Sequence, residues 1–381
     1  MGMHTDLLKE LLLEAAPSGH EARATQRWRA EAQTFADQVS QDSYGNVYAE
    51  LNPPPVGTPG STAPSRPIAL MAHLDEIGLM VTHVADDGII SFAGIGWWDP
   101  QVLVGQRVRL LAEGGDIIGV VGKVAIHLMN EADKLRASTL AGLWIDTTLI
   151  PEDARRRLPT GTVGVLEQPP LEQDGHLIAR ALDNRAGAFI VLEVLRELKA
   201  RRVTRHVVAV ATVEEELGFF GAQVSGYRLN PAAAIVVDGL HDTGQPGVGD
   251  SRYGRVRFGS GANLAVGSRL DARLLGQLKR AADEHGIPYS LSARPERSDT
   301  DADGLALARA GIPTALVSLP LRNVHTPSEM VRLSDVQACI DLLVAWVCAL
   351  PEGAPPVPDL ELWPSEEPGE ERSHADPGER S

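Results

Sequence analysis

Histidine and carboxylate side chains follow several apolar stretches of the sequence, at the point where each stretch ends. They are His73 and Asp75 after PIALMA, Asp183 after LIARAL, Glu215 and Glu216 after VVAVATV, Asp238 after AAAIVV, and His325 after TALVSLP. In open α/β sheets, ligand sites form at the carboxyl ends of the strands, so we expect these side chains to converge. Two histidines with several carboxylates and no cysteine suit a zinc, cobalt or manganese site.

Each of these residues also has an ordinary structural interpretation. Asp183 can cap a helix that begins at Asn184, Asp238 can belong to a turn, and Glu214–Glu216 can be a solvated charge run. A metal-free cluster, however, would gather like charges with nothing to neutralise them. The recurrence of such residues at five strand ends therefore favours a metal site.

The segments that position these residues alternate between helices and apolar strands. They include a helix over 184–200, strands over 206–213 and 232–238, and a last helix over 334–350. Two later units each read as a helix, a glycine, Ile-Pro and a strand, which predicts that Gly286 and Gly311 occupy helix C′ positions. From 77 to 178, short alternating apolar runs predict a small inserted β domain. The whole pattern predicts a mixed or mostly parallel sheet with helices on both faces.

The composition of the chain limits which kinds of partner it can bind and indicates its cellular compartment. The 381 residues carry a formal net charge of −16, which argues against a nucleic-acid partner or an anionic membrane surface. Residues 352–381 hold nine acids and two arginines, and with so little apolar content we expect this acidic tail to be disordered. Two cysteines, no signal-peptide pattern and apolar stretches of only about ten residues predict a soluble cytoplasmic protein.

Five motifs, in order along the chain, resemble the M42 family of metallo-aminopeptidases, the tetrahedral aminopeptidase group. They are AHLDEIGLMV (72–81), ALDNRAG (181–187), VEEELGFFGA (213–222), VVD (236–238) and RNVHTPSEM (322–330). The resemblance covers about residues 5–350, which is nearly all of the chain before the tail.

The resemblance implies a site with two divalent metal ions. Zinc is the expected metal, and cobalt and manganese are the alternatives. His73 and Asp238 would hold one ion, and His325 and Glu216 the other, with Asp183 bridging them. Glu215 would be the general base that activates a shared water. Asp75 would hydrogen-bond the second nitrogen of the His73 imidazole, which fixes the tautomer of a metal-binding histidine.

The implied architecture is a zinc-peptidase-like, mixed-sheet α/β catalytic domain with a small inserted β-barrel-like domain. We expect residues 1–76 plus 172–350 to form the catalytic domain, 77–171 the inserted domain, and 351–381 the tail. By resemblance, the inserted domain mediates dimer contacts, and relatives assemble further into dodecamers. The sequence does not show what the loop 52–66 or the tail contributes.

The implied function is hydrolysis of N-terminal residues from short peptides with a free N-terminus. A metal-dependent deacylase or carboxypeptidase on the same scaffold remains open, as does a non-catalytic scaffold protein. A glycosidase would leave the histidines unexplained. Asp299, in a loop that lies near the substrate in the family, is predicted to alter the specificity pocket, to bind a basic group or to belong to a surface turn.

Overall fold

The apolar segments on either side of the inserted β domain form the strands of one large mixed sheet. The computed structural model describes residues 3–54, 66–351 and 355–357. Within these residues the sheet has the order β1-β2-β12-β3-β13-β16-β17-β11-β10, and β14 pairs with both β15 and β16. The strands are β1 Gln38–Gln41, β2 Val47–Leu51, β3 Ile68–His73, β10 Leu171–Gln173, β11 His176–Ala179, β12 Val207–Thr212, β13 Ala233–His241, β14 Ala262–Gly267, β15 Tyr289–Arg294, β16 Thr314–Arg322 and β17 Glu329–Arg332.

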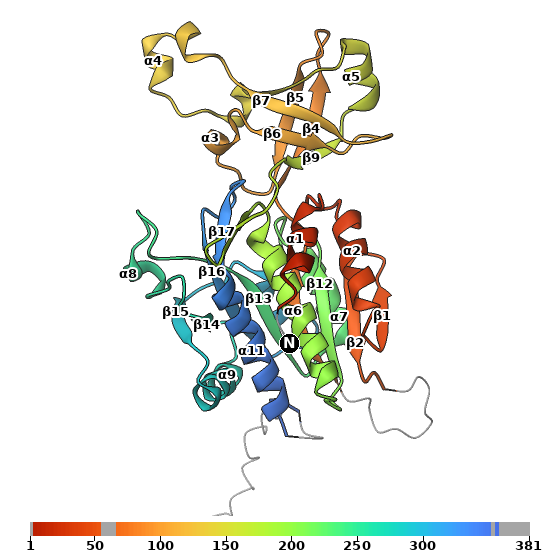
Figure 1. Cartoon of the computed structure of the whole chain (residues 1–381), viewed down its shortest axis with the longest axis vertical. Coiled ribbons are helices and arrows are strands. Elements are labelled where there is room, and N and C mark those ends of the chain that lie inside the picture. The colour runs from red at the N-terminus through yellow and green to blue at the C-terminus, as the bar shows by residue number, and fades with distance from the viewer. Residues whose placement is uncertain (1–2, 55–65, 352–354, 358–381) are drawn as a thin grey trace, which may run out of the picture.

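The centre of this sheet is parallel and buried on both faces. Strands β12, β3, β13 and β16 run in the same direction, and every residue of β3 and β12 is buried. Continuous apolar runs such as VVAVAT are typical of strands covered on both sides. Because the four strands are parallel, their carboxyl ends lie at one edge of the sheet, which faces the barrel above it (Figure 1).

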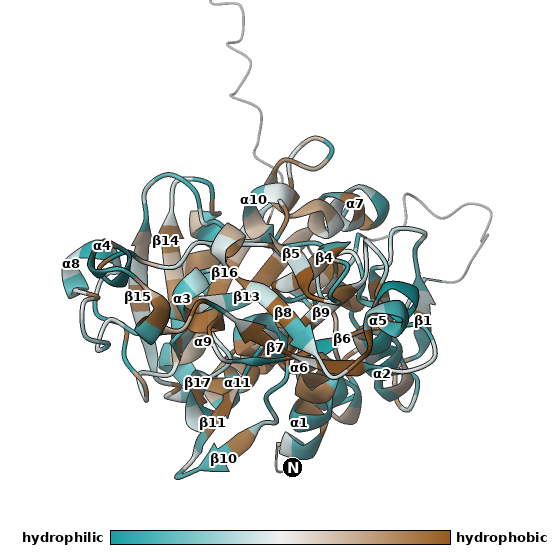
Figure 2. Ribbon diagram, turned by 90° about the horizontal axis from the view of Figure 1, so that it is seen from above, coloured by the Kyte–Doolittle hydropathy of each residue, from teal (hydrophilic) through white to brown (hydrophobic). Residues whose placement is uncertain are grey.

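Helices cover both faces of the sheet. Helices α6, α9 and α11 pack on one face, and α7 and α10 pack on the other. The helices are α1 Thr5–Leu13, α2 Ala22–Ala32, α3 Pro100–Leu103, α4 Glu131–Lys134, α5 Pro151–Arg157, α6 Leu182–Ala200, α7 Phe220–Leu229, α8 Asp250–Tyr253, α9 Ala272–His285, α10 Asp301–Ala306 and α11 Leu333–Ala349. Apolar residues concentrate in the strands and on the inward sides of the helices, whereas peripheral helices such as α5 are hydrophilic (Figure 2).

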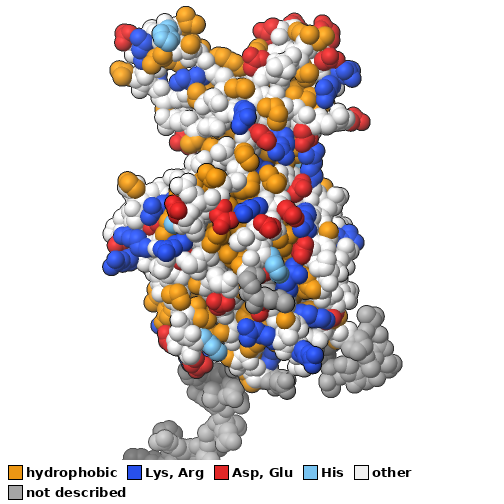
Figure 3. Space-filling view, viewed as in Figure 1, with side chains coloured by type: hydrophobic (Ala, Val, Ile, Leu, Met, Phe, Trp, Pro, Cys, Tyr) orange, Lys and Arg blue, Asp and Glu red, His pale blue; other side chains and the backbone are white. Residues whose placement is uncertain are grey.

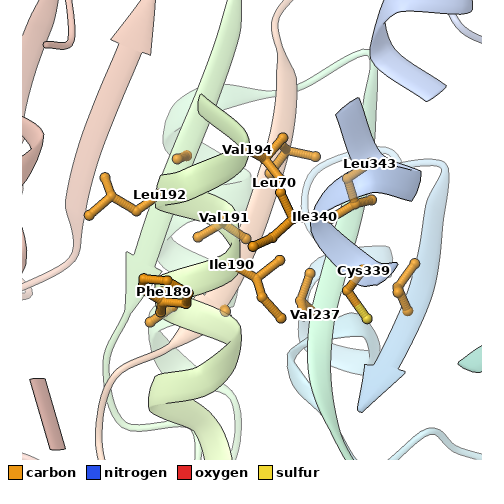
Figure 4. Packing of buried hydrophobic residues seen from close by; sticks show 14 of the residues in the cluster. Leu70, Phe189, Ile190, Val191, Leu192, Val194, Val237, Cys339, Ile340 and Leu343 are labelled. Atoms are coloured by element: carbon orange, nitrogen blue, oxygen red, sulfur yellow. The ribbon is translucent and has the colours of Figure 1, made fainter. Parts of the chain in front are cut away.

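The main core lies between the sheet and helices α6 and α11. Ile190 and Val194 of α6 pack among Leu70 of β3, Val237 of β13 and Ile340 of α11 (Figure 4). All five side chains are almost completely buried. This core fixes α6, whose first turn carries Asp183, against the strands that carry the other predicted ligands.

The inserted segment closes into a barrel with a core of its own. Its strands pair in the order β4-β5-β8-β7-β6-β9. They are β4 Gly78–Val84, β5 Ile90–Ile95, β6 Arg107–Leu110, β7 Ile117–Gly122, β8 Trp144–Thr147 and β9 Val163–Leu166. Leu79, Val108 and Ile145 are among the residues that fill its interior. Figure 1 shows the barrel standing above the large sheet.

The predicted fold class is confirmed, with one local correction. Gly286 lies at the C′ position of α9 with a φ of 63°, as the Gly-Ile-Pro pattern predicts. The same prediction for Gly311 is wrong, because α10 ends at Ala306 and irregular turns follow before β16. Gly311 still needs its glycine, since its φ is 97° in one of these turns.

The structure also bears on the two cysteines, on membrane-spanning helices, and on the loop 52–66 and the tail. Cys339 and Cys348 are both free thiols, the first buried and the second exposed. In the part of the chain that the structure describes, no helix has the length and apolar character needed to span a bilayer. Most of the loop 52–66 and of the tail 351–381 lies outside the described residues.

Candidate metal centre

The predicted ligands lie close together at the carboxyl ends of the parallel strands. His73 ends β3 and stands in register with Thr212, the last residue of β12. The loop after β12 carries Glu215 and Glu216, and Asp238 lies in the second half of β13. Because β3 is hydrogen-bonded to both β12 and β13, these side chains meet at the same sheet edge.

Asp183 faces both histidines. Its Oδ1 lies 3.3 Å from His73 Nε2, and its Oδ2 lies 3.8 Å from His325 Nε2. His73 Nε2 is also 3.8 Å from both Glu215 Oε2 and Asp238 Oδ1. His325 Nε2 is 3.1 Å from Glu216 Oε1.

The donor atoms fall into two groups of three. One group is His73, Glu215 and Asp238, and the other is Asp183, Glu216 and His325. Within each group the possible ligand atoms all lie within 4.8 Å of one another. Nitrogen and carboxylate oxygen at this spacing suit zinc or a similar divalent ion, so the residues fit a metal site.

Asp75 is fully buried and holds both the first histidine and the glutamate loop. Its Oδ1 lies 3.4 Å from His73 Nδ1, and the same ring nitrogen is 3.2 Å from the Asp75 backbone oxygen. The Asp75 carboxylate also accepts the backbone N–H groups of Glu215 at 3.1 Å and Glu216 at 3.2 Å. Ser18 donates its hydroxyl to the same carboxylate at 2.6 Å. Asp75 therefore orients three neighbours of the centre at once.

Glu329 is a buried residue of the site that the sequence did not reveal. Its Oε2 accepts the backbone N–H of Asp183 at 3.0 Å, and its Oε1 accepts that of His325 at 2.8 Å. One carboxylate thus ties together two backbone segments, each of which carries a predicted ligand. Its position four residues after His325, in HTPSE, is the one signal that pointed to it.

The barrel also contributes to the centre through a backbone atom. His325 Nδ1 lies 3.1 Å from the carbonyl oxygen of Trp97, which follows β5. With its proton on Nδ1, His325 donates to this carbonyl and leaves Nε2 free to bind a metal. The Trp97 side chain itself is 82% exposed, whereas Trp98 donates its indole N–H to the Gly78 carbonyl at 2.7 Å.

The pKa shifts reflect an excess of buried negative charge. Burial, together with neighbouring carboxylates, raises the pKa values of Glu215 and Asp238 well above their usual range. Although burial opposes it, the hydrogen bond with Glu216 raises the pKa of His325 to about 10. Burial also raises the pKa of Glu329 to about 8, with Asp183 as the next cause. These groups hold their protons because the buried carboxylates are not neutralised by nearby positive charge. Bound cations would supply that charge.

Two acidic residues outside the ligand set have partners of their own. Asp299 lines the cleft above the centre, and its carboxylate pairs with Arg297 at 2.6 Å. Glu214 is half-buried and accepts a hydrogen bond from the Tyr44 hydroxyl at 2.7 Å.

The sequence profile of the M42 glutamyl aminopeptidase family matches residues 56–342. The chain belongs to the M42 family. Relatives of known sequence include the lysyl aminopeptidase of Pyrococcus furiosus, 28% identical over 89% of this chain and 95% of that protein. The glutamyl aminopeptidase of Lactococcus lactis is 26% identical over 91% of this chain and 96% of the relative.

Solved M42-like structures share the fold over nearly the whole chain. A TET aminopeptidase from a marine-sediment thaumarchaeote has a TM-score of 0.83 and 26% identity, covering 91% of this chain and 96% of that one. The TET1 peptidase of Pyrococcus horikoshii, described as assembling into a tetrahedron or a large octahedral shell, has a TM-score of 0.78 and 25% identity, covering 91% of this chain and 99% of that one. The predicted M42 resemblance is therefore confirmed, and family membership implies the use of divalent metal ions.

Proposed function

We propose that this chain is a two-metal aminopeptidase that removes single residues from the free N-terminus of short peptides. The observation that carries the proposal is the position of Asp183, whose two oxygens face His73 and His325 separately. A carboxylate placed in this way can serve two metal ions at once. His73 and Asp238 would complete one ligand set, and His325 and Glu216 the other.

The charge of the site supports two ions rather than one. The site contains four carboxylates and only two histidines. Asp183, Glu216 and Asp238 are the proposed ligands, and Glu215 is the proposed base. Two divalent ions would supply four positive charges, which match these four carboxylates. Zinc suits the mixture of nitrogen and oxygen donors best, while cobalt and manganese share the same ligand types.

When bound, the two ions would lower the pKa of a water molecule and polarise the scissile carbonyl. The chain's own contribution to proton transfer is Glu215. Its carboxylate is buried beside the ligands, and Asp75 holds its backbone N–H at 3.1 Å. Glu215 would accept the proton of the attacking water and return it to the leaving amine. Burial, which raises its pKa, favours holding that proton between the two steps.

We further propose that the barrel, within 77–171, makes contacts between subunits, while 1–76 and 172–350 form the catalytic domain. The described part of the barrel exposes several apolar side chains on β7 and the segment after it. They are Ile118, Val120, Val124, Ile126, Leu128 and Leu135. Apolar side chains lie among charged ones on the lobe that carries α4 (Figure 3). Large apolar side chains exposed close together along the chain are a feature of subunit interfaces.

Metal removal and substrate blocking test the activity. The chelated protein should be inactive and regain hydrolysis of aminoacyl p-nitroanilides with zinc, cobalt or manganese. N-acetylated versions of the same substrates should not be cleaved. Glu215→Gln should keep its metal and lose at least about 100-fold in kcat, the scale of general-base catalysis. Activity that survives both chelation and Glu215→Gln contradicts the mechanism.

The same assay separates the alternatives. Cleavage of N-acetyl amino acids in preference to free-amine substrates would indicate a deacylase. Loss of activity on peptides amidated at the C-terminus would indicate a carboxypeptidase. A metal-loaded protein without activity on any of these substrates would indicate a scaffold function.

A further inference from the structure

The cleft above the metal centre has a basic wall. This cleft has a volume of about 980 Å³, and His73, Glu215 and Asp238 are among the residues that line it. Arg252 and Tyr253 of α8 line one side together with Arg294, the last residue of β15. Basic side chains gather at the edge of the molecule that carries α8 (Figure 3).

Two guanidinium groups of this wall share one aromatic ring. The Cζ atom of Arg294 lies 4.7 Å from the centre of the Tyr253 ring, and that of Arg252 lies 5.0 Å from it. Such contacts hold a guanidinium in place but leave its charge unneutralised. Among the described residues, neither arginine forms an ion pair.

Arg294 also has a donor without an acceptor. Its Nε is buried and has no hydrogen-bond partner among the described residues. Burial lowers the pKa of Arg294, so the surroundings disfavour its charge. An unpaired buried donor costs free energy that a bound anion would recover.

The two carboxylates that act electrostatically on Arg294, Asp238 and Asp299, both have other partners. Asp299 pairs with Arg297 at 2.6 Å. Asp238 also acts on Arg294 electrostatically, but it belongs to the metal centre. The free charges of the wall are therefore positive, which disfavours a substrate with a basic side chain.

Family membership does not decide the substrate, since relatives of similar identity include both a lysyl and a glutamyl aminopeptidase. We propose that Arg294, assisted by Arg252, binds the carboxylate side chain of an acidic N-terminal residue. This inference rests on the proposed aminopeptidase function. The N-terminal side chain leaves the carbon between the α-amine and the scissile carbonyl, so it must lie beside the metal centre, where Arg294 is. The C-terminal carboxylate of a dipeptide has the same chemistry and is the other source to be distinguished.

Rates on glutamyl, aspartyl, leucyl and lysyl p-nitroanilides test the proposal, because these substrates have no C-terminal carboxylate. The wild type should prefer the glutamyl or aspartyl substrate. Arg294→Ala should lower the glutamyl-to-leucyl ratio of kcat/KM by about 10- to 100-fold, the range for a lost charge-assisted hydrogen bond. Arg294→Lys should retain part of the preference, and Arg252→Ala should lower the ratio less. Arg156→Ala, on the exposed side of α5, is the matched control and should leave the ratio unchanged.

Binding provides a readout that does not need turnover. L-Glutamate should bind the metal-loaded Glu215→Gln protein more tightly than L-leucine in calorimetry, and Arg294→Ala should remove the difference. A wild type that prefers leucyl or lysyl substrates overturns the inference, as does an Arg294→Ala variant that slows all substrates equally. An effect of Arg294→Ala confined to dipeptides, and absent when they are C-terminally amidated, would assign the subsite to the C-terminal carboxylate and also overturn it. Failure of the aminopeptidase proposal would look different, because no free-amine substrate would then be cleaved by the wild type.

Discussion

Asp183 Oδ1 lies 3.3 Å from His73 Nε2, while the other oxygen of the same carboxylate faces the second histidine. Removing the charge of a shared ligand should weaken both metal positions. Asp183→Asn is therefore expected to lose most of both ions, whereas Asp238→Asn should lose mainly the ion of the His73 group. Elemental analysis of the purified proteins measures the number of ions per chain.

The matched control for these variants is Asp299→Asn. Asp299 is an exposed carboxylate in the same cleft, paired with Arg297 and outside both ligand groups. It should keep the wild-type metal content. Retention of two ions by Asp183→Asn would show that this residue does not bridge them.

Glu329 binds the backbone of two proposed metal ligands, Asp183 and His325, so its removal should disturb the geometry of the centre as well as its charge. Glu329→Ala leaves the N–H groups of Asp183 and His325 without their acceptor. Losses of about 10- to 100-fold in metal affinity or activity are typical when the groups that orient metal ligands are removed. We expect kcat to fall by this amount with little change in KM, since Glu329 does not line the large cleft.

Glu329→Gln separates the loss of one of these hydrogen bonds from the loss of both. Glutamine has one acceptor oxygen, so it can satisfy only one of the two N–H groups. Its activity should lie between those of the wild type and Glu329→Ala. Equal activity of all three proteins would remove Glu329 from the positioning role.

The buried ion pairs of Glu76 predict how the free energy of unfolding changes with pH. Glu76 is paired with Arg180 and, at 2.6 Å, with Arg185, and it accepts the Ala16 backbone N–H at 3.1 Å. Although burial opposes it, the two arginines lower the pKa of Glu76. A carboxylate with a lowered pKa in the folded state contributes stability above its unfolded pKa of about 4.3, and this contribution is lost as pH falls through the lower, folded value.

Glu76→Gln should therefore be less stable than the wild type at pH 7, and the difference should shrink as pH falls below about 4. Breaking a buried ion pair costs about 3–5 kcal/mol, so Glu76→Ala should lose that much in the free energy of unfolding. Urea unfolding at a series of pH values measures both effects. Glu167→Gln is the control, because its pair with Arg109 is partly exposed and should contribute about 1 kcal/mol or less. A pH-independent difference for Glu76→Gln would contradict the assignment.

The sequence predicted which histidine and carboxylate side chains come together, because each lies next to an apolar strand. His73 and Asp238 belong to buried parallel strands whose ends must meet, so their convergence follows from the α/β pattern alone. The position of Gly286 followed from local helix chemistry. The same pattern failed at Gly311, because α10 ends at Ala306, five residues earlier.

The interactions that the sequence could not reveal depend on backbone atoms or on distant segments. Trp97 acts through its carbonyl oxygen, which every residue has, so no side-chain pattern marks it. Glu329 was visible only as one acid after His325, since its partners are backbone N–H groups. Arg294 reaches the cleft from β15, which is separated from β13 by two strands, β16 and β14. Its contact with Tyr253 requires the fold to be known.

The exposed apolar side chains of the barrel predict that assembly can be disrupted without harming the fold. Leu128 and Leu135 are 80% and 90% exposed, so replacing them removes little from the barrel core. If this surface lies between subunits, Leu128→Asp with Leu135→Asp would bury unpaired charges in the interface, and the oligomer should dissociate. Light scattering coupled to size exclusion should then show a lower mass, with the thermal midpoint of the barrel retained. Leu171→Asp, an exposed leucine on β10 outside the barrel, is the matched control and should keep the wild-type mass. An unchanged mass for the double variant would place the subunit contacts elsewhere.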